Sequence, residues 1–170
     1  MHDTNLEKAL EIKLQGNDCF KKSEFEAAIN LYTEAIKTCP LSKKTDLSIM
    51  YQNRAAALER LDKYEEALKD CGESVRLNNR YGKSYDRRSK ILKKIVENMD
   101  KSKLDERIVH LRQALEDVSV LANLDGYRHE QLVLVDDILK QLGKFVNKFW
   151  TRLWSWTQLK EILFRKFSSS

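Results

Sequence analysis

The chain has 170 residues, a net charge of +5 and 34% charged residues, with only five glycines and one proline. This length suits one domain with a hydrophobic core, and the scarcity of glycine and proline argues against a turn-rich β fold. The three cysteines are odd in number and lack metal-ligand spacing, which predicts reduced thiols in the cytosol. No apolar run is long enough for a membrane-spanning helix, and residues 1–20 lack the apolar segment of a secretory signal.

Apolar residues recur at helical spacing along the chain, and they predict seven helices separated by short polar segments. The second helix is expected to stop before Pro40, because the residue before a proline is disfavoured in the α region. The fourth is expected to end near Asn78-Asn79, where asparagine tolerates left-handed geometry, and the seventh at Gly143. The predicted helices cover about 5–22, 23–39, 45–61, 64–78, 80–96, 104–124 and 130–142.

These helices form an internal repeat. The segment 25–29 (FEAAI) matches 64–68 (YEEAL) 39 residues later, and small residues lie where the paired helices should cross. Those residues are Gly16 and Ala28 in the first hairpin and Ala55 and Ala67 in the second. The pattern resembles the tetratricopeptide repeat (TPR), a helix-turn-helix unit of 34 residues. We therefore expect an all-α TPR solenoid of three repeats plus a seventh helix, in which the first helix of each repeat lines the inner face.

Five polar residues lie at matching phases of the three first helices. They are Lys13, Asn17, Asn53, Lys83 and Arg87. Residues four apart on a helix share a face, so each pair in this set projects together. If the helices lie side by side, three cations and two amides converge on a concave surface suited to a carboxylate-bearing ligand. The alternative interpretation is an ordinary solvated face.

The sequence around these residues resembles the carboxylate-clamp TPR domains of chaperone-binding proteins, in the blocks 13–17 (KLQGN), 51–57 (YQNRAAA) and 81–88 (YGKSYDRR). The resemblance implies that Lys13, Asn17 and Asn53 hold the terminal carboxylate of a peptide ending Glu-Glu-Val-Asp. It also implies that Lys83 and Arg87 meet the last side-chain carboxylate and the acids before it. The implied partners are the cytosolic heat-shock chaperones of the seventy- and ninety-kilodalton classes.

Residues 6–143 are more specifically similar to the large TPR receptors of the mitochondrial outer-membrane preprotein translocase, in the blocks 46–57, 115–126 and 132–143. This similarity implies a co-chaperone or adaptor linked to preprotein import, in the cytoplasm or on the cytosolic face of the outer membrane. Such receptors carry a membrane anchor before the first repeat and further repeats after the third. Neither is recognised here, so residues 1–143 are expected to be the chaperone-docking module alone.

Residues 144–170 differ in composition from the rest. They contain six lysines and arginines against one acid, together with all three tryptophans. An amphipathic aromatic and basic helix is predicted, with contacts through Phe149, Trp150, Leu153, Trp154, Trp156 and Phe167. It either caps the apolar end of the solenoid or lies on an anionic membrane surface. A third alternative is a disordered or partner-bound segment.

The sequence offers little material for catalysis. His2, His110 and His129 are scattered, Cys71 occupies an apolar helical position, and no glycine-rich phosphate loop is present. We therefore expect a non-enzymatic protein without cofactor or metal, and the short basic tail does not indicate nucleic-acid binding. The alternative function is a peripheral membrane-binding protein that acts through its C-terminal amphipathic helix.

Overall fold

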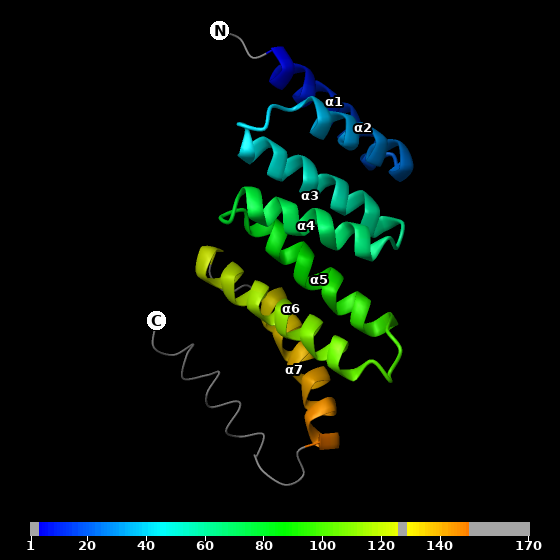
Figure 1. Ribbon diagram of the computed structural model, residues 1–170, viewed down its shortest axis with the longest axis vertical. Coiled ribbons are helices and arrows are strands. Elements are labelled where there is room, and N and C mark those ends of the chain that lie inside the picture. Colours follow the sequence, from blue (N-terminus) through cyan, green and yellow to red (C-terminus); the bar gives the residue numbers. More distant parts are fainter. Residues whose placement is uncertain (1–3, 126–128, 150–170) are drawn as a thin grey trace.

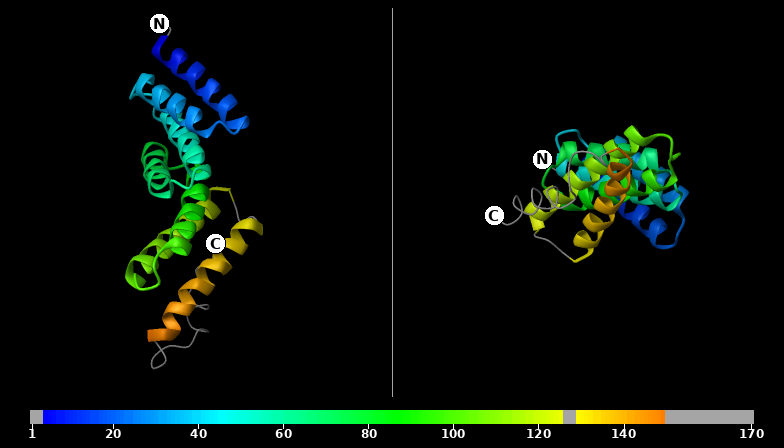
Figure 2. Two further views of the ribbon diagram at one scale, coloured as in Figure 1. Left: turned by 90° about the vertical axis from the view of Figure 1, so that its right-hand side faces the viewer. Right: turned by 90° about the horizontal axis from the view of Figure 1, so that it is seen from below.

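The computed structural model describes residues 4–125 and 129–149, and within them it has seven α-helices and no strand. Their bounds are α1 Thr4–Lys21, α2 Phe25–Thr38, α3 Lys44–Arg60, α4 Tyr64–Leu77, α5 Gly82–Asn98, α6 Leu104–Asp125 and α7 His129–Phe149. The helices follow one another along the long axis of the molecule, from α1 at one end to α7 at the other (Figure 1). Figure 2 shows the same stack from the side and from below. For these two ranges the predicted all-α solenoid is confirmed.

The turns within the first two hairpins share one backbone feature. Ser23, between α1 and α2, has φ 63°, and Asp62, between α3 and α4, has φ 57°. Left-handed geometry lets the chain reverse within three residues, and serine and aspartate stand where glycine is usual. Left-handed geometry was expected at Asn78-Asn79, and this was wrong: Asn78 has φ −145° and is extended. The chain there passes to the next repeat and does not need the sharp reversal of a hairpin.

The helices of each hairpin approach closely where the small residues lie. Ala28, Ala55 and Ala67 are fully buried. Gly16 faces the Tyr32 ring so closely that an added Cβ would lie 2.7 Å from Tyr32 Cε1. Glycine is therefore needed at this position because α1 and α2 lie too close together to leave room for a Cβ, and not because the backbone has an unusual angle.

The core is a chain of apolar clusters between successive helices. Met50 of α3 packs with residues of α1 and α2, Ile91 of α5 packs with α3 and α4, and Val118 of α6 packs with α5 and α7. Burying a side chain of this size contributes roughly 1.5–3 kcal/mol relative to leaving it exposed. Each repeat thus buries its apolar face against the next, as a solenoid requires.

Three fully buried serines join α3, α4 and α5. Ser74 Oγ lies 2.7 Å from the Ser48 carbonyl oxygen, Ser48 Oγ lies 3.0 Å from the Ser74 carbonyl oxygen, and Ser84 Oγ lies 2.6 Å from Ser74 Oγ. Each hydroxyl has one proton to donate. Ser74 and Ser48 each donate to the other's carbonyl oxygen, so every proton makes one hydrogen bond if Ser84 donates to Ser74 Oγ. The small hydroxyls allow close approach of three helices without leaving a buried donor unpaired.

Helix α7 is longer than expected. It continues through Gly143 to Phe149, so the predicted helix end at Gly143 was wrong, and the predicted boundary between residues 1–143 and 144–170 falls inside a continuous helix. A glycine within a helix costs about 1 kcal/mol but does not end it unless the chain must turn. Lys93 of α5 joins α7 through Asp137, with Nζ 2.5 Å from the carboxylate.

The predicted tail contacts at Trp150, Leu153, Trp154, Trp156 and Phe167 lie outside the described residues, and Phe149 is the last residue of α7. The capping and membrane-surface interpretations of this segment therefore stay predictions. In the ranges 4–125 and 129–149, each helix is either too short or too polar to cross a bilayer.

Candidate functional site

A hollow of about 290 Å³ opens between the first helices of the three repeats. Helix α1 contributes Asn17, Phe20 and Lys21, α2 contributes Tyr32, α3 contributes Gln52, Asn53 and Ala56, and α5 contributes Arg87. Three of the five predicted clamp residues thus meet at one place. They come together because α1 and α5 both pack against α3. The hollow is lined by amide and cationic donors together with the apolar groups of Phe20, Tyr32 and Ala56.

Asn17 is held in place by two neighbours. Its Oδ1 accepts hydrogen bonds from Tyr32 Oη at 2.8 Å and from Asn53 Nδ2 at 3.0 Å. Tyr32 is only 2% exposed, and burial raises the pKa of its phenol to about 12, so the group remains a donor at neutral pH. Because the Asn17 oxygen is engaged on the protein side, its NH₂ group is left to donate to a ligand. A carboxylate is the ligand best suited to such donors.

Arg87 enters the hollow from α5 and is tied to α3. Its Nη1 donates to Glu59 Oε2, and the two side chains are 27% and 15% exposed. The second Glu59 oxygen lies 3.7 Å from Lys94 Nζ. Glu59 therefore sits between two cations of α5, and the group of three keeps one net positive charge.

Lys13 and Lys83 do not line the hollow. Lys13 lies one turn before Asn17 on α1 and is half-buried, and Lys83 lies one turn before Arg87 on α5 and is exposed. Across the described part of the chain, neither lysine side chain makes a hydrogen bond or an ion pair. Both lysines are thus free to reach a ligand that extends beyond the hollow, and the convergence of all five residues stays a prediction.

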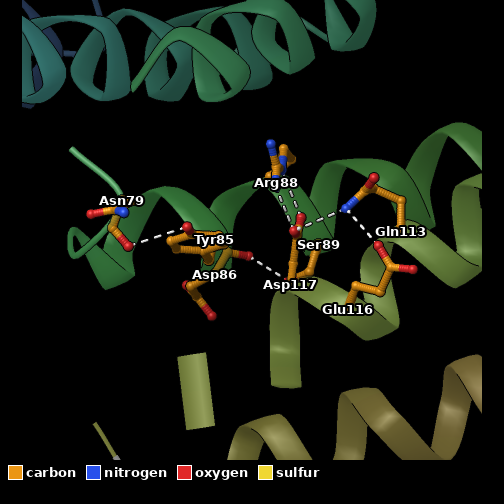
Figure 3. Close-up of polar contacts among 8 residues, drawn as sticks. All are labelled: Asn79, Tyr85, Asp86, Arg88, Ser89, Gln113, Glu116 and Asp117. Atoms are coloured by element: carbon orange, nitrogen blue, oxygen red, sulfur yellow. Dashed lines mark hydrogen bonds and ion pairs between the residues drawn. The ribbon is translucent and has the colours of Figure 1, made fainter. Parts of the chain in front are cut away.

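Arg54 and Arg88, which flank the predicted clamp, are committed to structural pairs. Arg54 Nε and Nη2 bind Asp70 at 2.7 and 2.8 Å. Arg88 Nε and Nη2 bind Asp117 at 2.8 and 2.6 Å, and Figure 3 shows the Arg88 guanidinium directed at the Asp117 carboxylate. The hydrogen bonds to these aspartates raise the pKa of both arginines. Both arginines are therefore paired with acids on the neighbouring helices α4 and α6.

Within residues 4–125 and 129–149, the groups with catalytic potential do not come together in one place. Burial raises the pKa of the Cys71 thiol to about 12, so the sulfur stays protonated and unreactive. His110 Nδ1 lies 2.7 Å from the Glu106 carbonyl oxygen of its own helix, and the side chain is only partly buried. Within the two described ranges, no three His, Cys, Asp or Glu side chains are grouped as a metal site.

Tyr32 and Glu59, which hold two of the predicted clamp side chains in place, were not singled out for this role from the sequence. Gly16 was the available signal for Tyr32, since a glycine next to Asn17 leaves room for a ring to reach the amide. For Glu59 the helical spacing carried no signal, because its partner Arg87 lies 28 residues away on another repeat.

The chain is 42% identical to the rat "Mitochondrial import receptor subunit TOM70" over 142 residues, which are 83% of this chain and 21% of that protein. The human TOM70 sequence is also 42% identical, over 141 residues. The chain therefore spans about a fifth of the length of these curated relatives. No family model matches the sequence.

Solved structures with the same arrangement include TPR domains with bound peptides. One is the first TPR of Spaghetti (RPAP3) bound to the HSP90 peptide SRMEEVD, with a TM-score of 0.67 and 28% identity over 81% of this chain and 94% of that chain. Another is the second TPR domain of human RPAP3 in complex with the HSP70 peptide SGPTIEEVD, with a TM-score of 0.63 and 25% identity over 79% of this chain and 97% of that chain.

Proposed function

Because the chain is a TPR domain homologous to the N-terminal region of TOM70, we propose that it is an adaptor that binds the acidic C-terminal ends of HSP70 and HSP90 chaperones. The observation that carries this proposal is the hollow in which Asn17, Asn53 and Arg87, from α1, α3 and α5, present donors to one place. The partners are proposed from the peptides bound in the similar RPAP3 domains. The role is binding rather than catalysis.

A peptide ending in aspartate supplies two carboxylates within one residue, and their four oxygens match amide and cationic donors. We assign the terminal carboxylate to Lys13, Asn17 and Asn53, and the side-chain carboxylate and preceding acids to Lys83 and Arg87. Charge-assisted hydrogen bonds contribute about 1.5–3 kcal/mol each when partly desolvated and about 0–1 kcal/mol when exposed. A short peptide should then bind with a Kd of about 1 μM, or about 8 kcal/mol.

Homology to TOM70 suggests association with the mitochondrial outer membrane. Within the proposed function, the domain acts on the cytosolic face of that membrane and receives chaperone-bound preproteins. The docking function is assigned to the repeats within residues 1–143, and the role of the aromatic and basic residues 144–170 stays a prediction. Tagging the chain in cells and treating intact mitochondria with protease would test the location, since a domain on the cytosolic face should be digested.

Calorimetric titration with a peptide ending Glu-Glu-Val-Asp tests the proposal directly. We expect micromolar binding to the wild-type chain and no measurable binding to Lys13→Ala or Arg87→Ala. Lys37→Ala is the matched control, because Lys37 is an exposed lysine on the outer helix α2. It should bind like the wild type.

The same titration with a C-terminally amidated peptide separates recognition of the free end from general attraction of acids. Amidation removes one charge and leaves the side chains intact, so a clamp for the chain end should lose nearly all affinity. Equal binding of the free and amidated peptides would refute the assignment of the terminal carboxylate to Asn17 and Asn53.

A further inference from the structure

Glu59 is an acid in direct contact with Arg87, one of the donors that line the hollow. Its side chain is 15% exposed and lies between Arg87 and Lys94, which are 27% and 45% exposed. One oxygen accepts from Arg87 Nη1 and the other lies 3.7 Å from Lys94 Nζ. Lys94 itself rests over the Tyr64 ring, 5.4 Å from the centroid. A negative charge is thus held at the edge of a site proposed to receive acidic ligands.

The Arg87 guanidinium makes fewer hydrogen bonds to its acidic partner than the guanidinium groups of Arg54 and Arg88 make to theirs. Arg54 and Arg88 each direct Nε and Nη2 at both oxygens of one aspartate. Arg87 meets Glu59 through Nη1 alone, and its buried Nε has no hydrogen-bond partner among the described residues. A guanidinium carries five N–H donors, so Arg87 keeps donor capacity while bound to Glu59. The contact with Glu59 leaves Arg87 able to bind a second carboxylate.

We infer that Glu59 attenuates the binding of acidic ligands at Arg87, and that Lys94 limits this attenuation by sharing the Glu59 carboxylate. The inference rests on the proposed function and adds to it a residue that sets affinity. A ligand carboxylate that reaches Arg87 lies close to the like charge of Glu59. Repulsion between them is strong, because both sit in a partly buried region of low effective dielectric.

The substitution Glu59→Gln tests the effect of the Glu59 charge separately from that of its size. Glutamine has nearly the same size, and its amide oxygen still accepts from Arg87, so the guanidinium keeps its anchor while the repulsion is lost. We expect this variant to bind the Glu-Glu-Val-Asp peptide roughly threefold to tenfold more tightly than the wild type. The gain should shrink when the salt concentration rises from 0.15 M to 0.5 M, roughly as screening predicts.

Glu34→Gln is the matched control, because it removes the same charge from an exposed position on α2. Its affinity should stay within about twofold of the wild type, as expected for a screened surface charge. A gain equal to that of Glu59→Gln would show that net charge alone sets the affinity, and would overturn the inference.

Lys94→Gln should change the peptide affinity in the opposite direction. Without Lys94 the Glu59 charge is less neutralised, so the peptide should bind more weakly than to the control Lys37→Gln. In the Glu59→Gln background the effect of Lys94→Gln should largely disappear, because the group through which Lys94 acts is gone. A Lys94 effect of the same size in both backgrounds would contradict the inference.

The outcomes separate the two proposals. Failure of the wild-type chain to bind the peptide overturns the proposed function and this inference with it. Binding by the wild type, with equal or weaker binding by a folded Glu59→Gln variant, overturns only the inference. If circular dichroism shows that Glu59→Gln does not fold, the comparison of Lys94→Gln with Lys37→Gln decides, and equal affinities of those two overturn the inference.

Discussion

The contact between Gly16 and Tyr32 joins the stability of the first hairpin to the geometry of the hollow. A Cβ at position 16 would lie 2.7 Å from Tyr32 Cε1 and 2.9 Å from Cδ1, whereas carbon atoms pack best about 3.5–4.0 Å apart. The ring of Tyr32 is buried and cannot move freely, and its hydroxyl donates to Asn17. Gly16→Ala should therefore displace the ring and weaken the hold on the Asn17 amide.

The size of the effect follows from three contributions. Overpacking a core position costs about 1–3 kcal/mol, and loss of the Tyr32–Asn17 hydrogen bond costs about 0.5–1.5 kcal/mol. Alanine gains about 1 kcal/mol over glycine in a helix interior, which offsets part of this cost. The free energy of unfolding should fall by about 0.5–3.5 kcal/mol.

Gly72 provides a control of the same chemistry. It lies inside α4, and an added Cβ there would meet no atom within 4 Å. Gly72→Ala should raise the free energy of unfolding by about 0.5–1 kcal/mol through helix propensity alone. The two glycine-to-alanine substitutions are thus expected to have opposite signs.

Urea unfolding followed by circular dichroism at 222 nm measures both variants, and the peptide titration is repeated on each. For a chain of this length, each kcal/mol shifts the melting temperature by about 2–4 °C. Gly16→Ala should also lose peptide affinity, while Gly72→Ala should keep it. A Gly16→Ala variant at least as stable as Gly72→Ala, with unchanged affinity, would refute the argument that the missing Cβ positions Tyr32 and Asn17.

Three further predictions follow from buried polar and titratable groups. Asp117→Asn, at a carboxylate 2% exposed, should lower the free energy of unfolding by about 3 kcal/mol in urea titrations, because the Arg88 charge loses its counter-ion; an unchanged midpoint would contradict this. Ser74→Ala should cost about 1–3 kcal/mol in the same assay by leaving the Ser84 hydroxyl buried without an acceptor, whereas the exposed Ser42→Ala should be neutral. Burial raises the pKa values of Cys71 and Tyr32 to about 12 from ordinary values of 9.0 and 10.0, so their stabilising contribution is complete below pH 9 and is lost as pH rises from 9 to 12. Thermal melts between pH 8 and 11 should show this loss, and it should be smaller in Cys71→Ala.

The elements of the fold could be predicted because their determinants are local. Apolar spacing located all seven helices, and Pro40 marked the region where the second one ends. The left-handed residues could not be placed in the same way. Ser23 and Asp62 adopt that geometry because a hairpin must reverse within a few residues. Serine is rarely left-handed and aspartate is so only occasionally, so neither residue type marks the position by itself. The end of α7 was missed because Gly143 was interpreted as a stop.

The candidate site shows the same division between local and distant determinants. Helical phase was enough to bring Asn17, Asn53 and Arg87 to one hollow. Which partner each side chain contacts depends on the distances between helices. The spacing of residues within one helix carries no information about those distances. The Tyr32 hydroxyl and the Glu59 carboxylate reach their partners across 15 and 28 residues of sequence, and only coordinates place them there.

The three predicted clamp residues that line the hollow belong to α1, α3 and α5, and the intervening packing runs mainly between successive helices. Such an array can unfold stepwise from its ends, since a terminal hairpin can detach without disturbing distant ones. A ligand that contacts all three helices opposes this fraying, because it binds only when the hairpins are docked together. Occupancy should therefore make the melting transition sharper as well as higher, and hydrogen exchange in α1 should slow when the peptide is present.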